Sequence, residues 1–155
     1  MIPSEVVTAI ISIVALVFTF VSVLQGLIEY RKQGVSKRAE TFLQMRSRLR
    51  EDVTFSRICE LLETDSEELR SIPIVDKDRF IGFFEELALM KNSGLINESV
   101  TLYMFGYFAI RCYDSQNFWY NLNREQPLWS LFMDFAKQMK ASEQKFQFER
   151  KHFHL

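Results

Sequence analysis

The stretch NFWYNLNREQPLW, residues 117–129, contains the residue types that recognise nucleotides. Aromatic faces stack on bases, asparagine amides bind base edges, and arginine or a helix amino terminus binds phosphate. The candidate side chains are Trp119, Tyr120, Asn121, Asn123, Arg124 and Trp129. The same composition also suits two tryptophans that anchor a core beside a polar turn. Ligand binding and core anchoring are therefore both open for this segment.

Basic side chains elsewhere in the chain add further candidates. Arg46, Arg48 and Arg50 follow one another at intervals of two residues, and they could bind phosphate or face anionic lipid. Arg111, in YFAIRCY, is a further candidate for ligand binding, or it could pair with a glutamate of FFEELALM across a helical hairpin. A third basic and aromatic group forms the tail, residues 145–155.

Enzyme chemistry is not indicated by the residues. The five glycines are scattered, so no glycine-rich phosphate loop is present. His152 and His154 are the only histidines, and their spacing matches no known zinc motif. A Ser-His-Asp set would have to use those tail residues. We therefore expect no catalytic site, no metal and no cofactor, and we expect Cys59 and Cys112 to be free thiols in a core.

An uncharged run of nineteen residues, Val6 to Leu24, lies near the start of the chain. At 1.5 Å per residue a helix of this length spans roughly 28 Å, close to the ~30 Å hydrocarbon layer of a bilayer. No base precedes the run, no cleavage motif follows it, and seven bases lie in residues 31–50. The sequence therefore predicts a retained transmembrane anchor in a bacterial inner membrane, with the amino terminus outside and the C-terminal domain cytoplasmic.

Small and hydroxyl residues recur along this run at intervals of three and four. They are Thr8, Ser12, Ala15, Thr19, Ser22 and Gly26. In lipid, such a seam permits close helix packing and hydrogen bonds between helices, so it predicts a homo-oligomer. A ring of helices could place the hydroxyl groups around a narrow polar lumen. Alternatively, each hydroxyl group bonds to a carbonyl of its own helix.

Helical periodicity continues beyond the anchor, and no strand pattern competes with it except briefly in the tail. The fold class is therefore all-α, with a single transmembrane helix followed by a five- or six-helix cytoplasmic domain. The predicted parts are an anchor (1–30), a basic juxtamembrane helix (31–50), the helical domain (51–144) and the tail (145–155). We expect a break in the helix at Gly34–Ser36 and a helix start at Asp76. The expected helix caps are Asp52 or Thr54, Asn97, and Gly94 at a C-terminal end. We also expect a short helix in SQNFWYNL (115–122) and Pro127 in the first turn of the last helix.

Residues 80–119, FIGFFEELALMKNSGLINESVTLYMFGYFAIRCYDSQNFW, resemble a bacterial family of unknown function. Its members carry one N-terminal transmembrane helix and a cytoplasmic helical domain. Their hairpin has a similar phrase, aromatic-Glu-Glu-Leu-Ala, then Gly-Leu-Ile, then a stretch with tryptophan. The resemblance covers about forty residues of this chain, and it implies the topology but no activity.

The overall plan is also similar to that of the membrane-bound ancillary effectors of type III CRISPR systems. In those proteins a cytoplasmic domain binds a cyclic oligoadenylate, and the transmembrane helices of a homo-oligomer perturb the membrane. No motif of that family can be matched here residue by residue, so the resemblance is one of architecture.

The function expected from these observations is that of a non-enzymatic membrane sensor-effector. Its helical domain would bind an anionic ligand, with a cyclic oligonucleotide as one candidate, and its anchor would perturb the bilayer, as in antiviral defence. The expected partners are lipid, a second copy of the chain and a cyclic nucleotide. The net charge of −1 gives no reason to expect duplex nucleic acid. The alternative is a membrane-anchored helical module that binds another protein.

Overall fold

The computed structural model describes the backbone of residues 4–145, and the side chains in this range except for residues 4–14, 27, 28, 31–33 and 35. The described chain is helical throughout and contains no strand, which confirms the all-α fold class. It divides into two compact units, Met1–Glu40 and Thr41–Leu155. Within the described part, none of the helices combines the length and the hydropathy that a membrane crossing requires.

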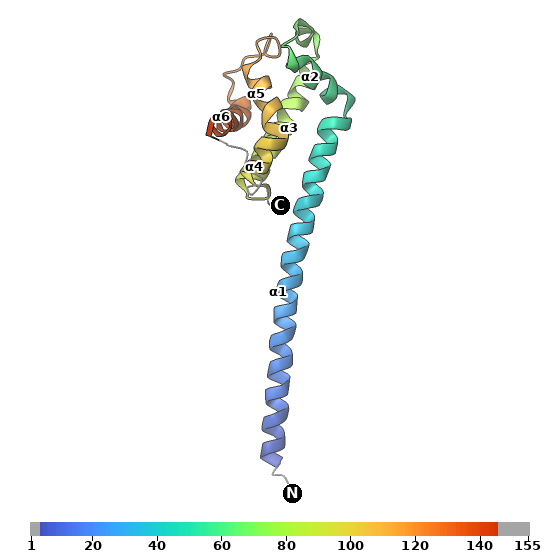
Figure 1. The fold of residues 1–155 in the computed structure, drawn as a ribbon, viewed down its shortest axis with the longest axis vertical. Coiled ribbons are helices and arrows are strands. Elements are labelled where there is room, and N and C mark those ends of the chain that lie inside the picture. Colours follow the sequence, from blue (N-terminus) through green and yellow to red (C-terminus); the bar gives the residue numbers. More distant parts are fainter. Residues whose placement is uncertain (1–3, 146–155) are drawn as a thin grey trace. The chain divides into compact units, whose positions relative to one another are not determined.

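The first helix, α1 (Ser4–Glu51), is continuous over 48 residues (Figure 1). The predicted break at Gly34–Ser36 is therefore wrong. A glycine inside a helix costs only about 1 kcal/mol relative to alanine, and the good helix formers that follow it outweigh that cost. The boundary between the two units lies instead between Glu40 and Thr41, inside the helix.

Local capping chemistry explains where the next helices begin and end. The Asp52 carboxylate accepts hydrogen bonds from the amides of Thr54 and Phe55, at 2.9 and 3.1 Å, and starts α2 (Val53–Glu63). A short 3₁₀ helix, η1 (Glu67–Ser71), follows it. The next helix, α3 (Ile74–Asn92), begins two residues before the predicted start and ends in a Schellman motif with Gly94 at a φ of 71°.

The second half of the domain contains four connected helical segments and a final long helix. Asn97 caps α4 (Glu98–Thr101), as predicted, and a π-helical segment, η2 (Leu102–Gly106), leads into α5 (Tyr107–Asp114). Gly106 ends this segment, and a Cβ atom there would lie 2.7 Å from Cδ1 of Leu102, so a larger residue would require the Leu102 side chain to move. After a loop, Pro127 opens the 3₁₀ turn η3 (Pro127–Trp129), and α6 (Ser130–Lys145) follows.

Phenylalanine rings fill the centre of the second unit. Phe80, Phe83 and Phe84 project from α3 and are fully buried, and the ring centres of Phe80 and Phe84 are 5.2 Å apart. Phe55 of α2 meets Phe80 at 5.3 Å, and Phe132 of α6 meets Phe84 at 5.9 Å. The central position of α3 follows from these contacts: α3 packs on α6, α6 packs on α5, and α5 packs on α2 (Figure 1).

The segment SQNFWYNL, predicted as a short helix, forms a loop, so that prediction is wrong. The reason lies fifty residues away at Asp65, whose carboxylate accepts hydrogen bonds from the Ser115 hydroxyl and from the amides of Gln116 and Asn117. The Ser115 hydroxyl in turn accepts a bond from the Phe118 amide at 2.8 Å. These bonds fix the path of the first residues of the segment, and Asn121, at a φ of 62°, has a left-handed backbone conformation through which a helix cannot continue.

Replacement of Asp65 tests whether this polar network stabilises the domain. Asp65 has a φ of 48°, which glycine adopts without strain and alanine does not. We expect Asp65→Gly to lower the free energy of unfolding of the full chain by about 2 kcal/mol, because it removes hydrogen bonds to a charged group. Asp65→Ala should cost about 1 kcal/mol more because of backbone strain. The measurement is urea unfolding followed by circular dichroism.

The matched control is Glu67→Ala, at an exposed carboxylate of the neighbouring turn for which no bond is found among the described residues. It should change the free energy of unfolding by less than about 0.5 kcal/mol. Equal stabilities for Asp65→Gly and the control would contradict the role assigned to the network.

Candidate functional site

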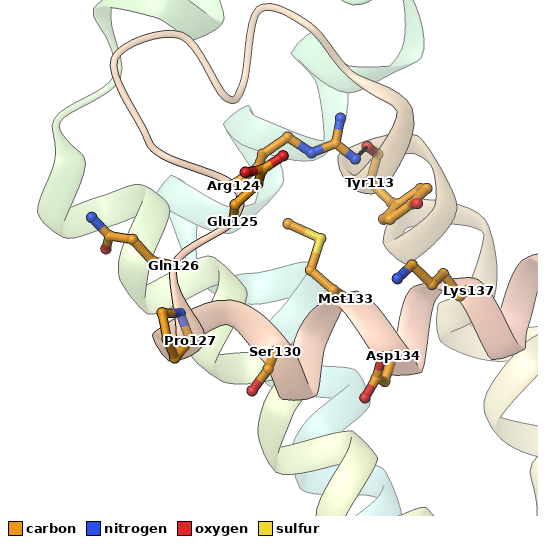
Figure 2. Close-up of a pocket in the computed structure, with 9 residues that line it drawn as sticks. All are labelled: Tyr113, Arg124, Glu125, Gln126, Pro127, Ser130, Met133, Asp134 and Lys137. Atoms are coloured by element: carbon orange, nitrogen blue, oxygen red, sulfur yellow. Dashed lines mark hydrogen bonds between the residues drawn. The ribbon is translucent and has the colours of Figure 1, made fainter.

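An open hollow of about 590 Å³ lies between the end of α5, the loop that follows it, and the start of α6 (Figure 2). Both polar and apolar side chains form its wall. They are Tyr113, Arg124, Glu125, Gln126, Pro127, Ser130, Met133, Asp134 and Lys137. The hollow has the size of a site for a small organic molecule, and one of the predicted binding side chains, Arg124, lies at its wall.

Arg124 is held in place by three contacts. Its guanidinium group donates a 2.7 Å hydrogen bond to the backbone carbonyl of Tyr113. The same group lies 4.8 Å from the ring centre of Tyr113 and 5.5 Å from that of Trp119. Cation–π contacts of this kind fix the planar group and leave its charge at the wall of the hollow.

The other three charges at the hollow belong to Glu125, Asp134 and Lys137. Figure 2 shows the Lys137 side chain reaching toward the hollow from α6, while the Asp134 carboxylate points away from it. No hydrogen bond or ion pair of either side chain is found within the described residues, although they are three residues apart on one helix. The Glu125 carboxylate lies near Arg124 at the opposite side (Figure 2).

The two tryptophans of the predicted binding segment belong to the core. Trp119 is 6% exposed and Trp129 is 5% exposed, and their ring centres are 6.2 Å apart. The Trp119 indole donates a 2.8 Å bond to the carbonyl of Cys112, whereas the Trp129 indole nitrogen has no partner among the described residues. Both rings are enclosed by other aromatic residues, so stacking on a ligand does not fit their burial, and core anchoring does.

Tyr120 and Asn123 remain at the surface of the loop. The Tyr120 ring is 49% exposed and lies 5.2 Å from the guanidinium carbon of Arg70. The Asn123 side chain accepts a 3.1 Å bond from the amide of Glu125 and so shapes the turn before η3. Of the predicted binding residues, the structure therefore places only Arg124 at the hollow.

The arginines of α1 lie elsewhere. Arg48 forms a 2.7 Å ion pair with Glu86, and its guanidinium carbon is 5.6 Å from the ring centres of Phe55 and Phe83. Arg46 is half-buried and Arg50 is exposed on the same helix. Because Arg48 is already paired with Glu86, its charge is less available to a phosphate.

Arg111 does not pair with a glutamate of α3, so the predicted hairpin ion pair is wrong. Its guanidinium carbon lies 5.2 Å from the ring centre of Tyr107, and the Tyr107 hydroxyl donates a 2.6 Å bond to Glu63. Arg48 takes Glu86 because the last turns of α1 run beside α3. Glu85 is half-buried, and burial raises the pKa of its carboxyl group, with a lesser opposite effect from the backbone amide of Phe132.

The predicted membrane seam is described only in part. The Thr19 hydroxyl bonds to the carbonyl of Ala15, and the Ser22 hydroxyl bonds to that of Phe18, each at 2.9 Å. These are the bonds within one helix that the sequence allows as an alternative. Gly26 is exposed, and the side chains of Thr8 and Ser12 lie outside the described residues.

The remaining candidates for chemistry are two cysteines and the tail. Cys59 and Cys112 are free and buried, as expected, and burial raises the pKa of the Cys59 thiol to about 12. Residues 146–155, with both histidines, lie outside the described part. Among the described residues, no three metal-binding side chains of the His, Cys, Asp and Glu types come together.

Lys77 is a buried cation that sequence reasoning missed. It is 1% exposed and lies on the phenylalanine face of α3, three residues before Phe80. Its ammonium group is 3.5 Å from the carbonyl of Tyr120 and 5.6 Å from the ring centre of Phe118. Burial lowers the pKa of this amine. The position of Lys77 in the apolar period of α3 is the signal that could have revealed it.

Replacement of this lysine by methionine should stabilise the protein. The charged amine is buried with one long hydrogen bond, so Lys77→Met should raise the free energy of unfolding at pH 7 by about 1 kcal/mol. The advantage should shrink as the pH rises toward 10.5, because the buried amine then loses its proton before the amine of the unfolded chain does.

The measurement is urea unfolding of the chain without and with Lys77→Met from pH 7 to pH 10.5. Both proteins carry Cys112→Ala, because Lys77 lowers the pKa of the Cys112 thiol and its replacement would otherwise change that titration as well, whereas the Cys59 thiol affects both proteins alike. A constant difference across this pH range would show that the buried charge has no effect on stability.

Comparisons with known proteins identify no relative of the chain. No family model, curated protein or solved structure matches the chain. The resemblance of residues 80–119 to a bacterial family therefore stays a prediction. What can be proposed about function comes from the side chains and contacts of the chain itself.

Proposed function

We propose that the chain is a non-enzymatic membrane sensor-effector: its N-terminal helix lies in lipid and self-associates, and its helical domain binds an anionic ligand. One observation carries the membrane part of the proposal. Large apolar side chains are exposed at neighbouring positions of α1, with Leu16 73%, Phe18 70% and Phe20 64% exposed. Since helix residues are 100° apart, these positions and Val17 point in different directions around the axis. A helix that is apolar over most of its circumference needs a cover other than water.

The charges that follow the apolar run support an orientation for it. Residues 31–50 carry seven bases and one acid, and the first two bases come within eight residues of Leu24. Basic residues are retained on the cytoplasmic side and are attracted by anionic headgroups, at about 1 kcal/mol each. The helical domain, which follows the bases, would then be cytoplasmic, in the inner membrane of a bacterium.

Self-association of the anchor is supported by its small residues. Ala15, Thr19, Ser22 and Gly26 recur at intervals of four, three and four, and such a stripe allows helices to approach closely. A hydroxyl group that donates to its own helix still has lone pairs to accept a bond from a neighbouring helix. Rearrangement of such a bundle is the step that would make the membrane leak.

The sensor part of the proposal needs a ligand that distinguishes two arrangements of the bundle. A shift from 1% to 99% of one arrangement requires about 5.5 kcal/mol of differential binding. Arg124 and Lys137 place two positive charges at the hollow for an anion, and of the two carboxylates at its wall that of Asp134 points away from it. A cyclic oligonucleotide is the ligand that the architectural resemblance implies, and of the three aromatic rings predicted to stack on it only Tyr120 is exposed.

A second candidate function, an anchored module that binds another protein, is favoured by one surface. Arg79 bonds to Asp52 at 3.1 Å and to Asp76 at 3.4 Å, so the first turns of α2 and α3 lie together. Val53, exposed to 83%, and Val75, exposed to 64%, lie at these turns. Exposed apolar side chains at two joined helix ends are typical of a small interaction surface.

Charged substitutions test the membrane location. The full chain is expressed in bacteria, and its membrane fraction is washed with carbonate at pH 11. We expect the native chain to stay with the membrane and the double variant Val17→Asp, Phe20→Asp to be released, because each acid at mid-bilayer costs about 3 kcal/mol. The control, Val17→Ala with Phe20→Leu, should stay bound. Native chain found in the wash would sink the proposal of a membrane anchor.

Cysteine crosslinking tests the seam. With a single cysteine introduced at Ala15 or Ser22, oxidation in the membrane should join two copies, whereas a cysteine at Val17 or Val23, off the seam, should react at least several-fold less. Thr19→Leu with Ser22→Leu should also reduce dye entry into expressing cells. Equal crosslinking at all four sites would exclude the seam. If no dye enters the cells under any condition and one protein co-purifies with the chain, the result would favour the interaction module.

A further inference from the structure

The hollow beside Arg124 contains a charge arrangement that the proposed function does not explain in detail. Lys137 and Arg124 supply two positive charges at its wall, and Glu125 supplies a negative charge near Arg124 (Figure 2). We infer that the hollow binds a small organic phosphate that also carries an amino group, with its phosphate on Lys137 and Arg124 and its amine on Glu125. This inference rests on the ligand-binding part of the proposed function and names the ligand class.

The phosphate end follows from the state of the two cations. Lys137 has no ion pair or hydrogen bond within the described residues, and its side chain reaches toward the hollow past Met133. Lys140, one turn later, is different, because both of its 2.7 Å bonds go to Asp114. Lys137 is therefore a donor that is available to a ligand.

Arg124 adds a fixed second charge to this end. One nitrogen of its guanidinium group is used on the Tyr113 carbonyl, and the group is held between the rings of Tyr113 and Trp119. A guanidinium fixed in this way loses little conformational entropy when an anion arrives. A phosphate monoester carries about −1.5 to −2 charges at pH 7, which matches two cations better than a carboxylate does.

The amino end follows from Glu125. The backbone amide of Glu125 is bound to Asn123, which fixes the residue in the turn, while no bond to its carboxylate is found in the described part of the chain. A phosphate alone would be repelled by this carboxylate, and an amine on the same ligand would turn the repulsion into an attraction. The volume of about 590 Å³ accommodates such a molecule with room for ordered water.

Trp119 gives the binding experiment an internal reporter. Its ring lies 5.5 Å from the Arg124 guanidinium carbon, so a ligand that contacts Arg124 should change the tryptophan fluorescence. The full chain in nanodiscs of phosphatidylcholine is titrated with phosphoethanolamine, with inorganic phosphate and with ethanolamine. We expect saturable binding of phosphoethanolamine, at least tenfold tighter than that of either fragment.

Two variants and one control locate the binding. Lys137→Glu should weaken phosphoethanolamine binding at least tenfold, whereas Lys145→Glu, at the end of the same helix and away from the hollow, should not change it. Glu125→Gln should remove most of the preference for phosphoethanolamine over inorganic phosphate. Absence of saturable binding, or equal weakening by both lysine variants, overturns the inference.

A second set of titrations distinguishes between two sources of the ligand. When the discs contain phosphatidylethanolamine, unchanged binding of soluble phosphoethanolamine assigns the site to a free phosphate monoester. Its loss by competition assigns the site to the lipid headgroup, which carries the same amine beside a phosphodiester. Carbonate washing and crosslinking of Lys137→Glu are measured alongside. If they match the native chain while no ligand binds, the inference fails and the membrane part of the proposed function stands.

Discussion

The phenylalanine contacts of α3 are the interaction on which the helical domain depends. Phe80, Phe83 and Phe84 are fully buried, and between them they touch aromatic rings of α2, η2 and α6. A buried phenylalanine stabilises a fold by about 1.5–3 kcal/mol through area alone, and edge-to-face ring pairs add about 1 kcal/mol. Three such residues therefore contribute as much free energy as the net stability of an ordinary small domain.

The same core determines what is left for binding. Trp119 is buried beside Phe118 and Phe132, so its indole ring is withdrawn from solvent. The same ring contacts the guanidinium group of Arg124. The loop that carries Arg124 is held at its start by Asp65, which belongs to the turn after α2. The hollow is thus positioned by the burial of the loop residue Trp119 in the core and by the bonds of Asp65 to the start of the loop.

Sequence reasoning succeeded where the cause is local. The Asn97 cap and the glycine at the end of α3 depend on bonds within a few residues and were predicted, and Asp52 is one of the two caps predicted for α2. It failed at residues 115–122, because the helical pattern there is overruled by Asp65, fifty positions away. The sequence also offered a pair between Arg111 and a glutamate of α3, whereas the structure pairs Glu86 with Arg48, a choice that depends on packing.

The candidate site shows the same limit. Composition selected the segment that borders the hollow, but it could not tell an indole in the core from one on the surface. Arg124 was predicted because it is an arginine in a loop before a helix, where phosphate is commonly bound. Lys137 was not predicted, because the sequence does not show whether a lysine on a helix has an ion-pair partner. Whether Lys137 has an ion-pair partner is decided only when α5 and α6 pack together in the folded chain.

The exposed apolar side chains of α1 impose the remaining constraint. Seven of them lie between Leu16 and Leu24. At about 1.5–3 kcal/mol for each side chain removed from water, covering them is worth on the order of 10 kcal/mol, comparable to the stability of a whole domain. These side chains point to all sides of the helix except the one lined by Ala15, Thr19, Ser22 and Gly26, on which a second copy would pack in the proposed bundle. In that proposal lipid would cover the apolar sides, so self-association along the seam and residence in a membrane would satisfy different parts of one surface.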